Sequence, residues 1–148
     1  MAPARLEEAR PEEARPEEAR PEEARLEGAC HCGAVRVSIP AAAVGVVICH
    51  CGDCRRLHGN GFAMLVADRD AVAWSGDADR LRHRTSPAVQ RSFCPRCGSR
   101  LAKEPDGAPK LLLSAGLFDD ARDRGAIRHL FVESAPAWDA VPPASPAA

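Results

Sequence analysis

Seven cysteines in three tight clusters constrain this 148-residue chain more than any other feature. An odd number leaves one thiol over in any disulfide set, and we recognise no export signal in the sequence. We therefore expect a cytoplasmic protein whose cysteines bind metal as thiolates. The clusters are C-x-C at Cys30 and Cys32, C-x-C-x-x-C at Cys49, Cys51 and Cys54, and C-x-x-C at Cys94 and Cys97.

The number of cysteines predicts how two zinc ions would share them. Zinc takes four protein ligands in structural sites, and three plus an open position in catalytic sites. Residues two apart on an extended strand face the same side, so each C-x-C pair can bind one ion. The sequence therefore predicts a closed structural site of Cys30, Cys32, Cys94 and Cys97, and an open site of Cys49, Cys51 and Cys54.

Short β-rich runs separated by Gly, Pro and Asp predict a mainly β domain of antiparallel sheets. Only six residues are aromatic, so the core is expected to be aliphatic, and structural zinc would add on the order of 10 kcal/mol of folding free energy. A turn at Glu104–Gly107 predicts a hairpin pairing 101–103 with 111–113. The best helical period covers Asp53–His58. The predicted strands are 35–39, 44–49, 62–67, 71–74, 89–93, 111–115 and 129–132.

The first 27 residues differ from the rest of the chain. They contain a five-residue Glu/Ala/Arg repeat with Pro11, Pro16 and Pro21, which disfavour a continuous helix, and almost nothing apolar. We expect a disordered tail at 1–27, one domain at 28–141 and a flexible Pro/Ala-rich end at 142–148. Beyond the tail, 15 basic residues face 12 acidic ones, a surplus of three that does not predict nucleic-acid binding. No apolar run approaches the length of a membrane span.

Four segments together resemble the glutathione-dependent formaldehyde-activating enzyme family, also called the GFA or CENP-V domain. The segments are Gly28–Gly33 (GACHCG), Cys49–Arg56 (CHCGDCRR), Arg91–Leu101 (RSFCPRCGSRL) and the stretch from His129-Leu130-Phe131-Val132 to Trp138. The resemblance covers about residues 28–141, with all motifs in order. The chain departs from it at Phe118-Asp119-Asp120-Ala121, where the family usually has Leu-Asp-Asp-Pro, and after Trp138.

The resemblance implies an Mss4-like fold of antiparallel sheets, two Zn²⁺ ions divided as above, and a carbon–sulfur lyase that uses glutathione and formaldehyde. Three thiolates give a zinc centre with a net charge of −1, which activates water poorly but suits a fourth soft ligand such as a thiol. The expected reaction joins glutathione, or a similar thiol, to formaldehyde or another small aldehyde. Arg55 and Arg56, just after Cys54, are candidates for pairing with glutathione carboxylates.

Other residues near the cysteines have alternative interpretations. His58 could complete the second zinc site and close it, whereas His50 should face away between two cysteines. Asp53 could orient the site or only cap the short helix, and the Gly59–Gly61 loop could move over substrate or be a plain turn. We expect Trp74 and Trp138 in the core.

Two further classes of function compete with the lyase. One is a non-catalytic zinc module of the CENP-V type that binds a partner. The other is a thiol redox protein using Cys94 and Cys97, which fails if zinc holds those sulfurs. The oligomeric state does not follow from the sequence.

Overall fold

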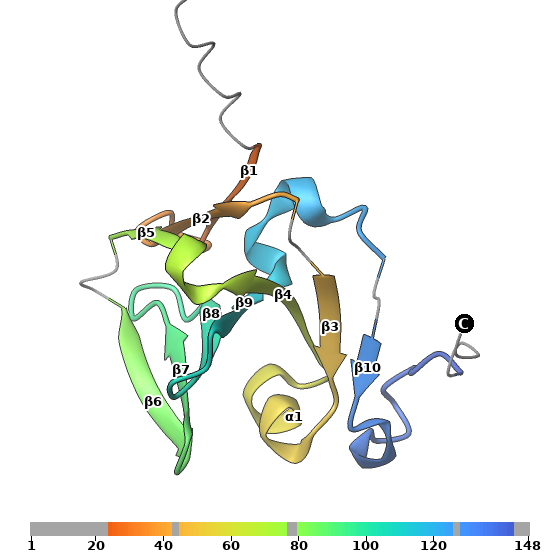
Figure 1. Ribbon diagram of the computed structural model, residues 1–148. Coiled ribbons are helices and arrows are strands. Elements are labelled where there is room, and N and C mark those ends of the chain that lie inside the picture. Colours follow the sequence, from red (N-terminus) through yellow and green to blue (C-terminus); the bar gives the residue numbers. More distant parts are fainter. Residues whose placement is uncertain (1–23, 43–44, 77–79, 126–127, 144–148) are drawn as a thin grey trace, which may run out of the picture.

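The computed structural model describes residues 24–42, 45–76, 80–125 and 128–143, and it places them in two β-sheets with one short helix (Figure 1). The smaller sheet has the order β1-β2-β5, and the larger has the order β10-β3-β4-β9-β8-β7-β6. The mainly β, antiparallel fold expected from the sequence is confirmed, apart from one parallel pair formed by β10 and β3.

The smaller sheet consists of β1 (Arg25–Ala29), β2 (Arg36–Pro40) and β5 (Ala73–Ser75). Its burial alternates along each strand, so that Leu26, Val37 and Ile39 face the core. At Gly28 the strand lies so close to Phe118 that an added Cβ would be 2.8 Å from its ring. This packing joins β1 to two short 3-10 turns, η3 (Ala115–Leu117) and η4 (Asp119–Ala121).

The larger sheet contains the predicted hairpin. Ala102 pairs with Leu113, and Lys103 with Leu112. The turn between them has Gly107 at φ +64°, which suits glycine. The strands of this sheet are β3 (Gly45–Cys49), β4 (Phe62–Asp68), β6 (Leu81–Ser86), β7 (Val89–Phe93), β8 (Arg100–Pro105), β9 (Lys110–Ser114) and β10 (Arg128–Leu130).

The core is mostly aliphatic, as expected, and falls into two clusters. The larger lies between the sheets and includes Ile39, Leu65, Leu101, Leu113 and Phe118. The smaller lies at the end of β3 and β4 and consists of Val47, Cys49, Cys54, Phe62 and Met64. Because two candidate ligands belong to it, the local core and the three-cysteine cluster are one packing unit.

Several predicted strand boundaries were wrong. The strand expected at 71–74 is shifted to Ala73–Ser75, because 69–71 form the 3-10 turn η1 (Arg69–Ala71). The last predicted strand ends at Leu130, since Phe131 adopts a left-handed conformation with φ +57° and η5 (Val132–Ser134) follows. Strands β1 and β6 were missed. The sequence of β6, LRHRTS, has almost no apolar alternation because the strand is largely exposed.

Two expectations about the chain ends also need correction. The folded part begins at least as early as Arg25, since Arg25–Glu27 belong to β1 and not to the tail. Trp138 is not a core residue, because 71% of it is exposed. Residues 1–23 and 144–148, on which the rest of those expectations depend, lie outside the described residues.

Among the described residues, no helix has the length and apolar character needed to cross a membrane. Helix α1 (Gly52–His58) matches the period expected at 53–58 and has seven residues.

Candidate metal centres

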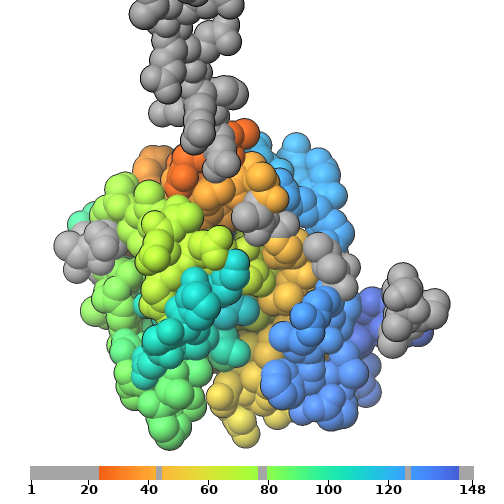
Figure 2. All heavy atoms as spheres, viewed as in Figure 1, coloured from red at the N-terminus to blue at the C-terminus, as the bar shows by residue number. Residues whose placement is uncertain are grey.

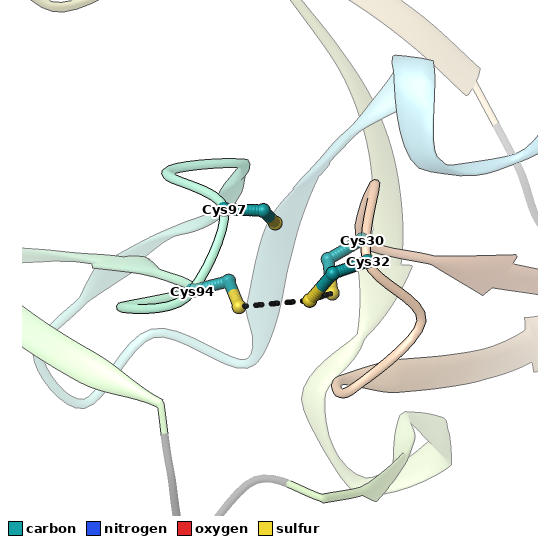
Figure 3. A group of neighbouring side chains, drawn as sticks. All are labelled: Cys30, Cys32, Cys94 and Cys97. Atoms are coloured by element: carbon teal, nitrogen blue, oxygen red, sulfur yellow. Dashed lines mark hydrogen bonds between the residues drawn. The ribbon is translucent and has the colours of Figure 1, made fainter.

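Two turns that are far apart in the sequence bring four cysteines together (Figure 3). Cys30 and Cys32 lie in the turn between β1 and β2, and Cys94 and Cys97 lie in the turn between β7 and β8. In the second turn the Gly98 N–H donates to the Cys94 carbonyl, and Gly98 has φ +75°, a conformation that favours glycine. The cluster therefore connects the β1–β2 turn of the smaller sheet to the β7–β8 turn of the larger sheet.

The spacing of these sulfur atoms fits a tetrahedral ion. The Sγ atoms of Cys30 and Cys32 are 3.6 Å apart, and those of Cys32 and Cys94 are 3.8 Å apart. Zinc bound by thiolates at about 2.3 Å would separate neighbouring sulfurs by about 3.8 Å. Hydrogen bonds also reach these sulfurs: the Val35 N–H donates to Cys30 Sγ, and hydrogen bonding with the side chain and backbone of Ser99 lowers the pKa of Cys97 to about 5. These four thiols could hold a metal ion.

The other cluster forms where β3 meets α1. Cys49 is the last residue of β3, and Cys51 is the N-cap of the helix, its sulfur accepting from the Cys54 N–H at 3.5 Å. Cys49 and Cys54 are fully buried, whereas Cys51 is half-buried. Within the described part of the chain, the three sulfurs lie within 4.8 Å of one another and no other His, Cys, Asp or Glu joins their group.

His58 does not complete this cluster in the structure. Its ring stacks on Phe62 with 3.7 Å between the centroids, and its Nε2 is buried without a hydrogen-bond partner. Burial, together with the positive charges of Arg91 and Arg100, lowers the pKa of His58 to about 4. At neutral pH His58 is therefore a neutral side chain that packs on Phe62.

His50 faces away from the sulfurs, as expected, and bonds to the C-terminal segment. Its Nδ1 donates to Asp139 Oδ2 at 2.6 Å, and its Nε2 lies 2.9 Å from His129 Nδ1. The Gly61 N–H donates to the same carboxylate oxygen at 3.1 Å. Figure 2 shows the blue C-terminal segment lying against the yellow segment that contains α1. The sequence did not predict the contacts of Asp139 and His129 with His50, because separations of 89 and 79 residues leave no local spacing signal.

A buried arginine contacts the three-cysteine cluster. Arg91 on β7 places its Nη2 at 3.5 Å from Cys54 Sγ, and its Nε donates to Thr85 Oγ1 at 3.3 Å. Burial raises the pKa of Cys54 to about 12, although Arg91 opposes this by its hydrogen bond and its charge. Proton release would therefore accompany metal binding at Cys54. Arg91 belongs to the Arg91–Leu101 segment of the resemblance, but no pattern in the sequence predicts its contact with Cys54.

The other candidates lie on the surface of α1. Arg56 and Asp53 are exposed, and Arg55 is half-buried. Asp53 lies in the first turn and does not cap the helix, since Cys51 has that position. Gly59 ends the helix, and its N–H donates to the Arg55 carbonyl.

Comparison with known proteins gives three findings. The model of the family described as "Glutathione-dependent formaldehyde-activating enzyme" matches residues 25–134. A protein of Halomonas elongata named "Putative glutathione-dependent formaldehyde-activating enzyme" is 34% identical over 129 residues, which cover 75% of this chain and 77% of that protein. A crystal structure of a Rhodobacter sphaeroides protein has a TM-score of 0.56 at 20% identity, covering 70% of this chain and 99% of that one. This last similarity concerns the fold alone.

Proposed function

We propose, from the premise that this chain belongs to the glutathione-dependent formaldehyde-activating enzyme family, that it is a zinc-dependent carbon–sulfur lyase. Its substrates would be glutathione, or a similar small thiol, and formaldehyde or another small aldehyde. The observation that carries the proposal is the cluster of Cys49, Cys51 and Cys54, three thiols within 4.8 Å with no fourth ligand-type side chain in their group among the described residues. A cytoplasmic location, where glutathione is abundant, fits this chemistry.

The seven cysteines would be divided between two zinc sites, as their number predicts. Cys30, Cys32, Cys94 and Cys97 would hold a structural zinc ion, and Cys49, Cys51 and Cys54 would hold the second. Zinc bound at the second site would supply a Lewis acid, which lowers the pKa of a thiol that coordinates it. The half-buried Cys51 is the member of the cluster through which a small thiol can approach, since the other two cysteines are buried.

The reaction is an addition that balances without a redox partner. The thiol loses its proton to solvent, and the sulfur electron pair forms a bond to the carbonyl carbon. The carbonyl π electrons move to oxygen, which then takes a proton from solvent to give the hemithioacetal, an S-hydroxymethyl thioether when the aldehyde is formaldehyde. The protein orients the thiol and shields the sulfur from bulk water, while Arg91 holds Cys54 in place.

The test compares Cys54→Ser with the parent for zinc content and for glutathione–formaldehyde turnover above the uncatalysed background. We expect two zinc ions in the parent, one in a folded Cys54→Ser, and loss of turnover in the variant. Asp120→Ser, which changes an exposed residue, is the control that should keep both zinc ions and full turnover. Global unfolding of Cys54→Ser, or a single zinc ion in the parent, would contradict the division of the cysteines.

A non-catalytic interaction module is the second candidate. Three large apolar side chains are exposed within eight residues, namely Phe131, Val132 and Trp138, and such surfaces often bind partners. Two tightly held zinc ions with no turnover above background would favour this function over the lyase.

A further inference from the structure

A small cavity lies beside the three-cysteine cluster, between α1 and the strands β6, β7 and β8. Its volume is about 90 Å³, and its walls include Phe62, Phe93, His58, Arg91 and Arg100. Since a water molecule in the liquid takes about 30 Å³, the space suits a group of roughly three such volumes. A carboxylate group, together with the carbon that bears it, fits in this space.

The sheet geometry directs Arg91 to this cavity. Residues two apart share a face of a strand, and His83 on β6 pairs directly with Arg91 on β7. His83, Thr85 and Arg91 therefore lie on one face, and all three line the cavity. The position of Arg91 is set by its two bonds, to Thr85 and to Cys54.

Arg91 has unused bonding capacity. Only 7% of the residue is exposed, and its Nη1 is buried without a hydrogen-bond partner. Among the described residues, no carboxylate bonds to it, although a buried guanidinium normally needs an anionic or fully bonded environment. The thiol of Cys54, which would be a thiolate on a metal ion, is one source of negative charge. The unpartnered Nη1 of Arg91 indicates that a second negatively charged group binds here.

Two arginines, Arg91 and Arg100, are part of the cavity lining. Arg100 lies over the ring of Phe93 at 5.3 Å, no acidic residue is part of the lining, and the Nε2 of His58 is also without a partner. Burial is the main cause of the low pKa of His58, and the charges of Arg91 and Arg100 lower it further. A cavity whose lining includes two arginines and no acidic residue favours an anionic oxygen group.

We propose that this cavity binds a carboxylate of the thiol substrate, with Arg91 and Arg100 as its recognition residues. The inference rests on the proposed function, because it concerns a thiol that binds at the neighbouring cysteine cluster. It assigns carboxylate recognition to the β7–β8 side of the site and not to Arg55 and Arg56 on α1. Thiols that carry a carboxylate are then preferred over neutral thiols of similar size.

The experiment measures thiol binding and not turnover. The second site is loaded with Co²⁺, whose visible absorption changes when a further thiolate joins it, and the protein is titrated with glutathione and with glutathione diethyl ester. The ester keeps the thiol and loses both carboxylates. We expect the parent to bind glutathione at least about tenfold more tightly than the ester, a typical effect of a charge-assisted hydrogen bond.

Two variants locate the preference. Arg100→Gln, at a half-buried residue that does not bond to Cys54, should reduce the preference for glutathione without loss of Co²⁺. Arg91→Lys keeps the charge and removes the fork geometry, and it should reduce the preference too. Arg122→Gln removes one exposed positive charge elsewhere and is the matched control.

The outcomes separate this inference from the proposed function. Equal affinity for the two thiols, or a preference that survives in Arg100→Gln and Arg91→Lys and disappears in Arg56→Gln, overturns the assignment to the cavity and leaves the lyase proposal standing. If neither thiol changes the Co²⁺ spectrum, the open thiol-binding site itself is wrong, and both proposals fall.

Discussion

Asp139 accepts a 2.6 Å hydrogen bond from Nδ1 of His50, a residue that lies between two of the candidate zinc ligands. The histidine is 2% exposed and the aspartate side chain 9%, so this contact is almost entirely shielded from water. It joins the C-terminal segment to the end of β3, next to the parallel pair that β3 forms with β10. The backbone continues the same link, since the His50 N–H donates to the Leu130 carbonyl at 2.9 Å.

Removal of the Asp139 carboxylate should destabilise the fold. Asp139→Ala leaves His50 Nδ1 and the Gly61 N–H without their acceptor, and a buried unsatisfied donor costs about 1–3 kcal/mol. We expect chemical denaturation to show a loss of about 2 kcal/mol or more in the free energy of unfolding. Asp120→Ala, at an exposed residue, is the control and should change it little. Equal stability of the two variants would show that the contact contributes nothing.

An added methyl group at Gly61 should disturb the same region by a different mechanism. A Cβ at Gly61 would lie 2.8 Å from the ring of His50 and 2.8 Å from the side chain of Ile48. Gly61→Ala should therefore cost about 1–3 kcal/mol by overpacking, measured by thermal or chemical denaturation. Gly125→Ala is the matched control, because a Cβ there would meet nothing within 4 Å. A Gly61→Ala variant as stable as the control would contradict the close packing of the loop on His50.

The stability of the protein should fall in mild acid partly because of His58. Its folded pKa of about 4 is below the ordinary value of 6.5, so between these values the unfolded chain binds a proton that the folded chain does not. The contribution of the neutral His58 is complete above about pH 6.5 and is lost as the pH falls toward 4. The His58→Leu variant should lose less stability than the parent between pH 7 and pH 5, measured by denaturation at equal zinc content. Parallel pH profiles for the two proteins would exclude this role.

Deletion of residues 1–23 should leave the domain intact. The repeat has almost no apolar residues to bury, and the first described strand begins at Arg25. We expect the shortened protein to keep its zinc content, its turnover and its melting temperature within error. Deletion of residues 1–29, which also removes β1, is the informative contrast and should reduce stability strongly, since Leu26 packs in the core. Loss of zinc on the shorter deletion would show that the repeat supports the fold.

Local patterns predicted much of this architecture. Strand β7 was expected at 89–93 and is found there, and the 101–103 to 111–113 hairpin was predicted from its turn residues alone. The two cysteine groups likewise follow from ligand number and spacing, and the structure brings each group together. Such features depend on residues that are close in sequence, or on the number of cysteines, since seven ligands divide simply into four and three. The extended strand expected for each C-x-C pair was wrong, because Cys30 and Cys32 lie in a turn and Cys51 caps α1.

Features that depend on distant contacts were not predictable in the same way. Strand β6 is polar and pairs only at the edge of the sheet, so no alternation marked it. Trp138 was expected in the core on its residue type, yet the chain beyond Phe131 packs through Asp139 and leaves the indole exposed. The role of Arg91 depends on the pairing of β6 with β7 and on the position of α1, which no single motif contains.

The two cysteine groups differ in sequence span, and this would affect how a metal ion bound at each group is coupled to the folding equilibrium. Cys49, Cys51 and Cys54 are close enough for the unfolded chain to chelate an ion, whereas Cys32 and Cys94 are 62 residues apart and meet only after a large loop has closed. A ligand that binds the unfolded chain as well as the folded one adds little to stability. The concentration of free zinc should therefore set the folded population mainly through the four-cysteine group, and metal starvation would deplete folded protein and not only its activity.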